Sequence, residues 1–98
     1  MPVFFVEQKE FSRERTEPFL NLSHNSFELI KRILEKDWEG FGAIDPEESQ
    51  RIVQELNNVS LSDICFFAKD IKKTFLLLLK VKRVFEDAVR KNLTVFWS

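Results

Sequence analysis

The longest helical pattern in the chain covers residues 69–91, KDIKKTFLLLLKVKRVFEDAVRK. At 100° per residue, its side chains separate into two arcs. Seven basic side chains share one arc of about 100°: Lys69, Lys72, Lys73, Lys80, Arg83, Arg90 and Lys91. The rest of the circumference is almost entirely apolar, which is more than one neighbouring element can cover. We therefore expect a long helix at the centre of the core, with one cationic stripe facing the solvent.

The charge of the chain is unevenly distributed. Residues 69–91 carry eight basic and three acidic side chains, a net charge of +5, whereas the remainder carries seven and thirteen, a net charge of −6. The total of −1 excludes a uniformly basic nucleic-acid binder. The stripe, about 33 Å long, suits either an anionic partner or simple solvation, and we favour solvation. It contains no aromatic side chain, so stacking on nucleic-acid bases is not predicted.

Short strands are expected at both ends of the chain. Val3–Val6 and Leu93–Trp97 are rich in β-branched and aromatic residues, a composition typical of strands. Between them, Asn25 followed by Glu28 predicts a capped helix start. The fold class we expect is α+β: three helices, with the long C-terminal one central, packed on a small sheet formed by the N- and C-terminal strands. Residues 1–98 are expected to form a single domain, since a chain of about 100 residues usually folds around one core.

The second helix has the clearest start signal. Asp45 is a capping residue, Pro46 suits the first helical position, and Glu48 lies three residues after the cap. The helix is expected to bury its apolar side chains and to end at residues 57–58. Its acidic side chains are candidates to neutralise the cationic stripe within the molecule.

Several segments leave alternatives open. Residues 7–18 are charged and predict a surface connection or a hairpin return, and residues 19–22 predict either a second strand or an extended lead into a helix. Residues 59–68 are either a loop or a short helix capped by Ser60 or Ser62. Gly40 and Gly42 are expected to break the first helix and to form a tight connection.

The composition bears on the cellular compartment of the protein and on its cysteine chemistry. The chain has 98 residues and one cysteine, so we expect no internal disulfide and no thiolate zinc site. Its most apolar segment, residues 75–79, is far below the ~20 residues of a membrane span. The N-terminal residues lack a signal-peptide pattern. These features predict a cytoplasmic protein without a membrane partner.

One polar run resembles a site. Asn21, Ser23, His24 and Asn25 precede the first helix, where side chains and helix N–H groups favour anions. The alternative, which we favour, is that these residues cap the helix and satisfy turn backbone. A lone histidine does not make a metal site. Cys65 follows Ile64 and is expected to be a small buried hydrophobe, so we predict no catalytic, metal-binding or cofactor-binding residue.

Three large aromatic residues, Trp38, Phe41 and Trp97, lie near the ends of the expected elements. We expect two of the three in the core. An exposed one would contribute to an apolar patch that suits a partner protein or a homodimer.

Three short motifs carry a family resemblance. LNLSHNSF at residues 20–27, GAIDPE at residues 42–47 and TVFWS at residues 94–98 resemble a group of small uncharacterised bacterial proteins. That group has an LNLSNxNF-type first-helix start, a G-x-I-D-P-E turn and a terminal V-x-W-G. The chain departs from this pattern at His24, in place of Asn, and at Ser98, in place of Gly.

The resemblance spans residues 20–98 and implies no activity, cofactor or catalytic residue. It does imply that the segment 21–25 and Trp97 belong to one structural feature. Our leading hypothesis is a non-enzymatic protein-interaction module, with a homodimer as one form. The alternative is a binder of nucleic acid or another polyanion through the stripe, and a third option is a small-ligand pocket at Asn21–Asn25.

Overall fold

The expected C-terminal helix forms as α4, Ile71–Lys91, in the computed structural model, which describes residues 3–6 and 20–97. The side chain of Asp70 caps the first turn by accepting a hydrogen bond from the Lys73 N–H at 3.0 Å. Asn92 ends the helix in the left-handed conformation, with φ of 56°. Its N–H donates to carbonyl groups of the last turn, as is common at helix C-termini. The prediction of one unbroken helix through the leucine run is confirmed.

The sheet has four antiparallel strands in the order β2-β1-β4-β3. Its two central strands are β1, Val3–Val6, and β4, Val95–Trp97. They pair as predicted from the two ends of the described chain, with Phe4 opposite Trp97 and Val6 opposite Val95. The predicted surface connection at residues 7–18 lies outside the described residues.

The two edge strands are short. β2, Leu20–Asn21, pairs with β1, so the described part of the segment that was left open contains a two-residue strand. β3, Gly42–Ile44, was not expected, because Gly42 was interpreted as part of a tight connection. Gly42 lies opposite Trp97, whose indole ring covers it: a Cβ atom built on Gly42 would lie 2.1 Å from the ring. Glycine is needed there because the ring occupies the place of a side chain.

The predicted start of the second helix is confirmed, and that of the first helix is corrected. α2, Pro46–Asn57, begins after Asp45, whose carboxylate accepts from the Glu48 N–H at 2.7 Å. α1, His24–Leu34, is capped by Ser23 and not by Asn25, because the Ser23 hydroxyl lies 3.1 Å from the Ser26 N–H. The helix ends at left-handed Glu35, well before the glycines that were expected to break it.

The described residues contain four helices, one more than predicted. α3, Leu61–Phe67, occupies the segment that the sequence left open as helix or loop. The Ser60 hydroxyl accepts from the Asp63 N–H, and the Asp63 carboxylate accepts from the Ser60 N–H at 3.0 Å. This reciprocal capping box stabilises a seven-residue helix that is too short to show a helical period.

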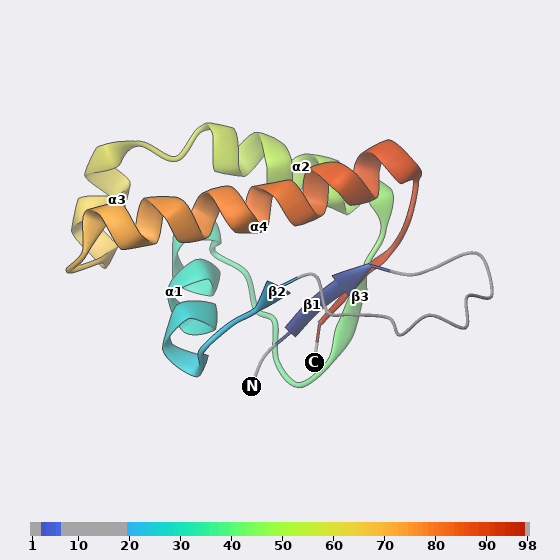
Figure 1. The fold of residues 1–98 in the computed structure, drawn as a ribbon, viewed down its shortest axis with the longest axis horizontal. Coiled ribbons are helices and arrows are strands. Elements are labelled where there is room, and N and C mark those ends of the chain that lie inside the picture. Colours follow the sequence, from blue (N-terminus) through green and yellow to red (C-terminus); the bar gives the residue numbers. More distant parts are fainter. Residues whose placement is uncertain (1–2, 7–19, 98) are drawn as a thin grey trace.

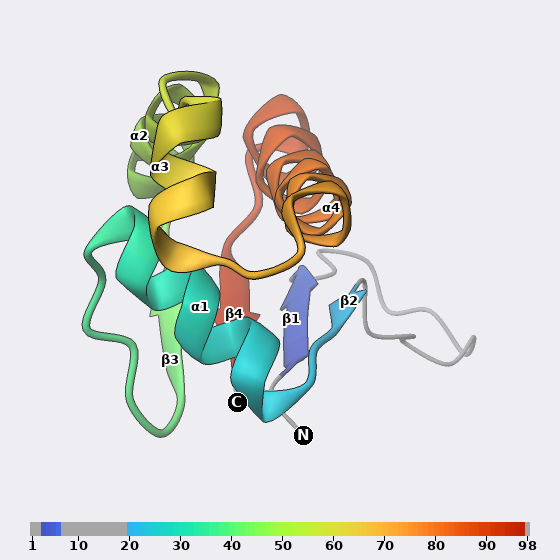
Figure 2. The same ribbon diagram turned by 90° about the vertical axis from the view of Figure 1, so that its left-hand side faces the viewer.

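The helices lie on one side of the sheet. Figures 1 and 2 show α2 and α4 side by side above the strands, with α1 and α3 near the end where α4 begins. Five aromatic rings meet at the centre of the core, with neighbouring centroids 5.5–6.3 Å apart: Phe4, Phe27, Trp38, Phe85 and Trp97. Trp38 is buried and Trp97 is partly buried, as expected for two of the three aromatics. Phe41, the third, is exposed.

The fold class α+β is therefore confirmed, with α4 contributing the largest share of buried residues. The resemblance groups the segment 21–25 with Trp97, but Asn21 and Trp97 belong to strands on opposite sides of β1, and His24 and Asn25 belong to α1. Within the described part of the chain, no helix has both the length and the apolar composition needed to cross a bilayer.

Candidate functional site

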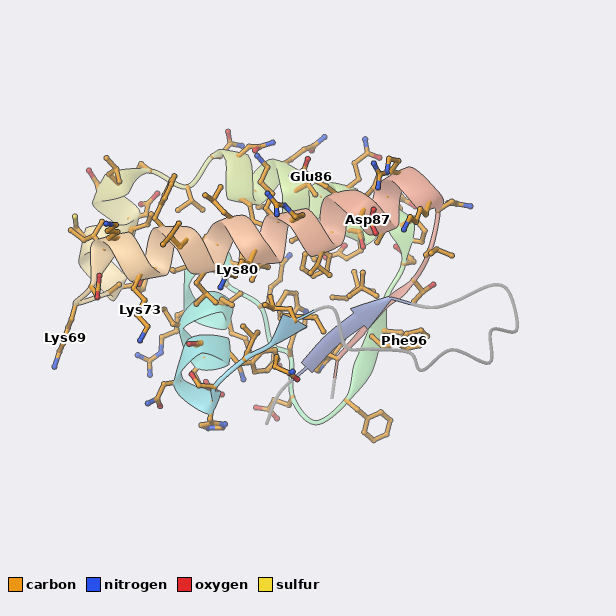
Figure 3. All side chains as sticks on the ribbon, in the orientation of Figure 1. Lys69, Lys73, Lys80, Glu86, Asp87 and Phe96 are labelled. Atoms are coloured by element: carbon orange, nitrogen blue, oxygen red, sulfur yellow. The ribbon has the colours of Figure 1, made fainter. Side chains whose placement is uncertain are left out.

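The seven basic residues of the predicted stripe are all exposed. Lys69 immediately precedes α4, and the other six lie on it. Figure 3 shows Lys69, Lys73 and Lys80 extending from the side of α4 that faces α1, whereas Glu86 lies on the other side. The helix thus carries its cations on one flank.

Asp87 interrupts the stripe near its C-terminal end. Its carboxylate accepts from the guanidinium of Arg90 and lies 3.1 Å from Nζ of Lys91. Burial raises the pKa of Asp87, but the hydrogen bonds from Lys91 and Arg90 outweigh it, and the net pKa is below its ordinary value. These two cations are therefore both paired with one carboxylate within the last turns of α4.

Five cations remain: Lys69, Lys72, Lys73, Lys80 and Arg83. None of them forms an ion pair with any other residue that the structure describes. The acidic side chains of α2, considered as neutralising partners, bind elsewhere: Lys36 lies 3.4 Å from Glu48 and 3.2 Å from Glu55. Within the described part of the chain, the positive charge in the first half of α4 therefore has no ion-pair partner.

The same half of α4 exposes large apolar side chains, which corrects the expectation of a fully buried apolar arc. Ile71, Phe75, Leu76 and Leu79 are 40–49% exposed. The reason is the position of the neighbours: Figure 1 shows the sheet beneath the C-terminal half of α4, while only α1 and α3 flank its beginning. The buried side is narrower than the apolar arc, so the excess faces outward.

The exposed residues form two adjacent rows. Ile71, Phe75 and Leu79 are four residues apart, so they follow one another at 40° steps over about 12 Å. The neighbouring row is formed by Lys72, Leu76 and Lys80, and Arg83 lies beside it. We call this surface the α4 outer face and define it by its members: Ile71, Lys72, Phe75, Leu76, Leu79, Lys80 and Arg83.

The sequence contained a signal for this surface. At 100° per residue, Leu76 falls in the middle of the arc that holds the cations, so the stripe was never purely polar. Eight large hydrophobic residues are exposed in the described part of the chain, and six of them lie between residues 66 and 79. Phe66 is 82% exposed and lies just before α4 begins. Its ring packs edge to face against the ring of Phe67, with the two ring centroids 4.9 Å apart.

The polar run before α1 borders an open groove of about 640 Å³. Ser23, His24 and Asn25 line it together with Lys69 and Lys73 of α4. The predicted stripe and most of the predicted polar site therefore meet at the N-termini of two helices. Asn21 belongs to β2 and is not among the residues that line the groove.

Ser23 is the member of the polar run that caps α1. The Ser23 hydroxyl accepts from the Ser26 N–H and donates to the Ser26 hydroxyl at 2.8 Å. Glu28, which also lines the groove, lies 2.8 Å from Nζ of Lys31, and its hydrogen bond to Lys31 lowers the pKa of its carboxyl.

Cys65 is exposed on α3, contrary to the expectation of a buried thiol. The short helix buries only Ile64, which turns the next residue outward. The described residues contain no cluster of three or more histidine, cysteine or carboxylate groups that could hold a metal ion.

Comparison of the chain with protein families, with curated proteins and with solved structures gives no significant match.

Proposed function

We propose that this protein is a non-enzymatic interaction module of the cytoplasm that binds a partner protein through the α4 outer face. The observation that carries the proposal is the gathering of exposed large apolar side chains in the first half of α4. On the opposite side of the same half, Thr74 and Leu78 are buried. Contiguous exposed apolar surface of this kind marks interaction sites in folded proteins.

The composition of the face supports a protein partner. Ile71, Phe75 and Leu79 form a continuous apolar row, and Lys80 and Arg83 lie at its margin. Stable interfaces combine an apolar centre with a polar rim, and aromatic residues and arginine are enriched in them. A partner that covers this row removes from water the apolar area that folding leaves exposed.

The test is site-specific photo-crosslinking in the cells that make the protein. Benzoylphenylalanine is placed at position 76, in the face, or at position 50, on the exposed surface of α2, as the control. We expect one discrete adduct from position 76 that disappears with Phe75→Asp, and none from position 50. Equal adducts from both positions, or an adduct at position 76 that survives Phe75→Asp, would contradict the proposal.

A second candidate is binding of nucleic acid or another polyanion. It is supported by the five cations that form no ion pair among the described residues. Reversal of Lys73, Lys80 and Arg83 to Glu is then expected to abolish retention on a heparin column, and retention of the wild type is expected to fall steeply with salt. Unchanged retention of the triple variant would exclude this function.

Two further candidates, a homodimer and a small-ligand site, each have a direct test. If a homodimer is the functional form, the apparent mass in light scattering rises with concentration, and a strict monomer removes it. If the groove beside His24 binds a small ligand, a ligand-induced rise in melting temperature disappears in His24→Ala.

A further inference from the structure

We propose that the occupant of the α4 outer face is an acidic amphipathic helix of a partner protein, aligned along α4 with its acidic flank toward α1. This inference rests on the interaction proposed above and adds the chemistry of the partner. Three features carry it: the one-sided charge of the face, its helical rows and its length.

The charge of the face is all of one sign and lies to one side. Lys72, Lys80 and Arg83 are the charged members of the face, and Lys69 and Lys73 continue the positive charge toward α1 (Figure 3). Beyond Leu79 the line of the apolar row continues along α4 with Lys82 and Glu86, which lie 4.0 Å apart. A complementary ligand carries apolar side chains over the row and carboxylates over the flank that faces α1.

The shape of the face suits a helix. Ile71, Phe75 and Leu79 form an i, i+4, i+8 ridge about 12 Å long, and such ridges pack into the grooves between the rows of another helix. Helical ligands present matching apolar side chains at i, i+3, i+4 and i+7. A strand ligand needs the free edge of a sheet, and the strands that form the edges, β2 and β3, belong to another layer of the molecule.

A second copy of the same face is a poor occupant. A symmetric dimer with its two α4 helices antiparallel would bring Lys72, Lys80 and Arg83 of one copy against the same cations of the other, and like charges in contact disfavour association. The face carries no carboxylate that could compensate them.

An anionic membrane surface fits less well than a protein. Helices that lie in a membrane interface carry their cations along the polar face on both sides of the apolar stripe. Here the cations that form no ion pair with the described residues lie on one flank only, and Glu86 continues the line of the apolar row, where its negative charge disfavours anionic lipid.

The experiment selects peptides that bind the α4 outer face from a library of randomised sequences. The full chain is presented to a phage-displayed library of 16-residue helical peptides with randomised surface positions, and peptides that also bind the Phe75→Asp variant are removed. We expect the remaining peptides to share an apolar i, i+4, i+7 row with aspartate or glutamate along one flank. Basic peptides, or peptides without charge preference, overturn the proposal.

Charge reversal then tests the flank. Lys80→Glu is expected to weaken the selected peptide about fivefold in fluorescence anisotropy, the effect of reversing one exposed charge pair. The matched control Arg51→Glu, on the exposed surface of α2, is expected to change affinity less than twofold. An equal effect of both substitutions overturns the alignment along α4. Leu76→Asp, a second substitution in the face, must abolish peptide binding as Phe75→Asp does.

Two other occupants are outcomes of the same experiment. Stronger binding to vesicles of phosphatidylserine and phosphatidylcholine than to any selected peptide would replace the protein partner by a membrane. A dimer in light scattering that Phe75→Asp dissociates would replace it by a second copy. If position 76 forms its adduct in cells but the selected peptides lack acidic flanks, the proposed function stands and the acidic helix is wrong.

Discussion

Leu78 and Leu79 are adjacent and chemically identical, yet the structure gives them opposite roles. Leu78 is 6% exposed, within the core formed by α4, α2 and the sheet, whereas Leu79 is 44% exposed on the α4 outer face. Replacing each by alanine therefore separates stability from binding. We expect Leu78→Ala to cost stability and to leave partner binding by the folded protein intact. We expect Leu79→Ala to cost little stability and to weaken binding.

The magnitudes follow from burial. Leucine to alanine removes three carbons, about 2.4 kcal/mol at ~0.8 kcal/mol for each buried group. The cavity left at a closed site raises this to roughly 3–4 kcal/mol for Leu78. At Leu79 nearly half of the side chain is already in water and no closed cavity forms, so about 1 kcal/mol is expected. In a domain of this size, 1 kcal/mol shifts the melting temperature by about 4–8 °C.

The assay is urea unfolding followed by tryptophan fluorescence, with the buried Trp38 as reporter. Both variants are expected to keep the slope of the wild type, because the surface exposed on unfolding changes little. The free energy of unfolding should then differ between them by about 2 kcal/mol or more. Equal losses would mean that the α4 outer face is packed in the folded protein, and the interaction proposal would lose its basis.

Three further predictions concern the fold. Gly42→Ala places a methyl group against the indole of Trp97 and is expected to cost about 1–3 kcal/mol in urea unfolding; no loss would show that the ring moves freely. Ser23→Ala is expected to cost about 1 kcal/mol and Asn25→Ala much less, since Ser23 is the cap of α1; the reverse order would restore Asn25 as the cap. Hydrogen bonds from its capping box hold the pKa of Asp63 below 3.8, so its carboxylate contributes stability above that pH and loses the contribution as pH falls through the folded-state pKa. Asp63→Asn should therefore destabilise at pH 7 and progressively less toward pH 2; a constant difference across urea titrations would contradict this.

The parts of the fold that sequence reasoning predicted have local physical causes. The start of α2 follows from Asp45 and Pro46, which favour a helix in any context. The exit of α4 at Asn92 follows from the tolerance of asparagine for the left-handed conformation. The pairing of β1 with β4 was expected from the composition of the two strands, and the structure confirms it.

The parts that were missed depend on tertiary neighbours. β3 is three residues long and exists because β4 offers an edge to Gly42 and Ile44. The exposure of Cys65 and Phe66 follows from the place where α3 docks, which no periodicity encodes. The α4 outer face was missed because a helical period shows how much apolar surface a helix has, not how much of it the fold will cover.

We expect the five cations, which form no ion pair with the described residues, to limit self-association through the exposed apolar row of α4. Lys72, Lys80 and Arg83 flank the row on one side, so they disfavour contact between two copies of the face, and an acidic helix is attracted by the same charges. The two effects respond oppositely to salt, because screening shortens the reach of charge from about 10 Å at 0.1 M to about 3 Å at 1 M. Added salt should therefore promote self-association of the wild type in light scattering while weakening the acidic peptide in anisotropy. If self-association and peptide binding change in the same direction with salt, charge does not determine whether a second copy or an acidic helix binds the face. The apolar row alone must then account for binding.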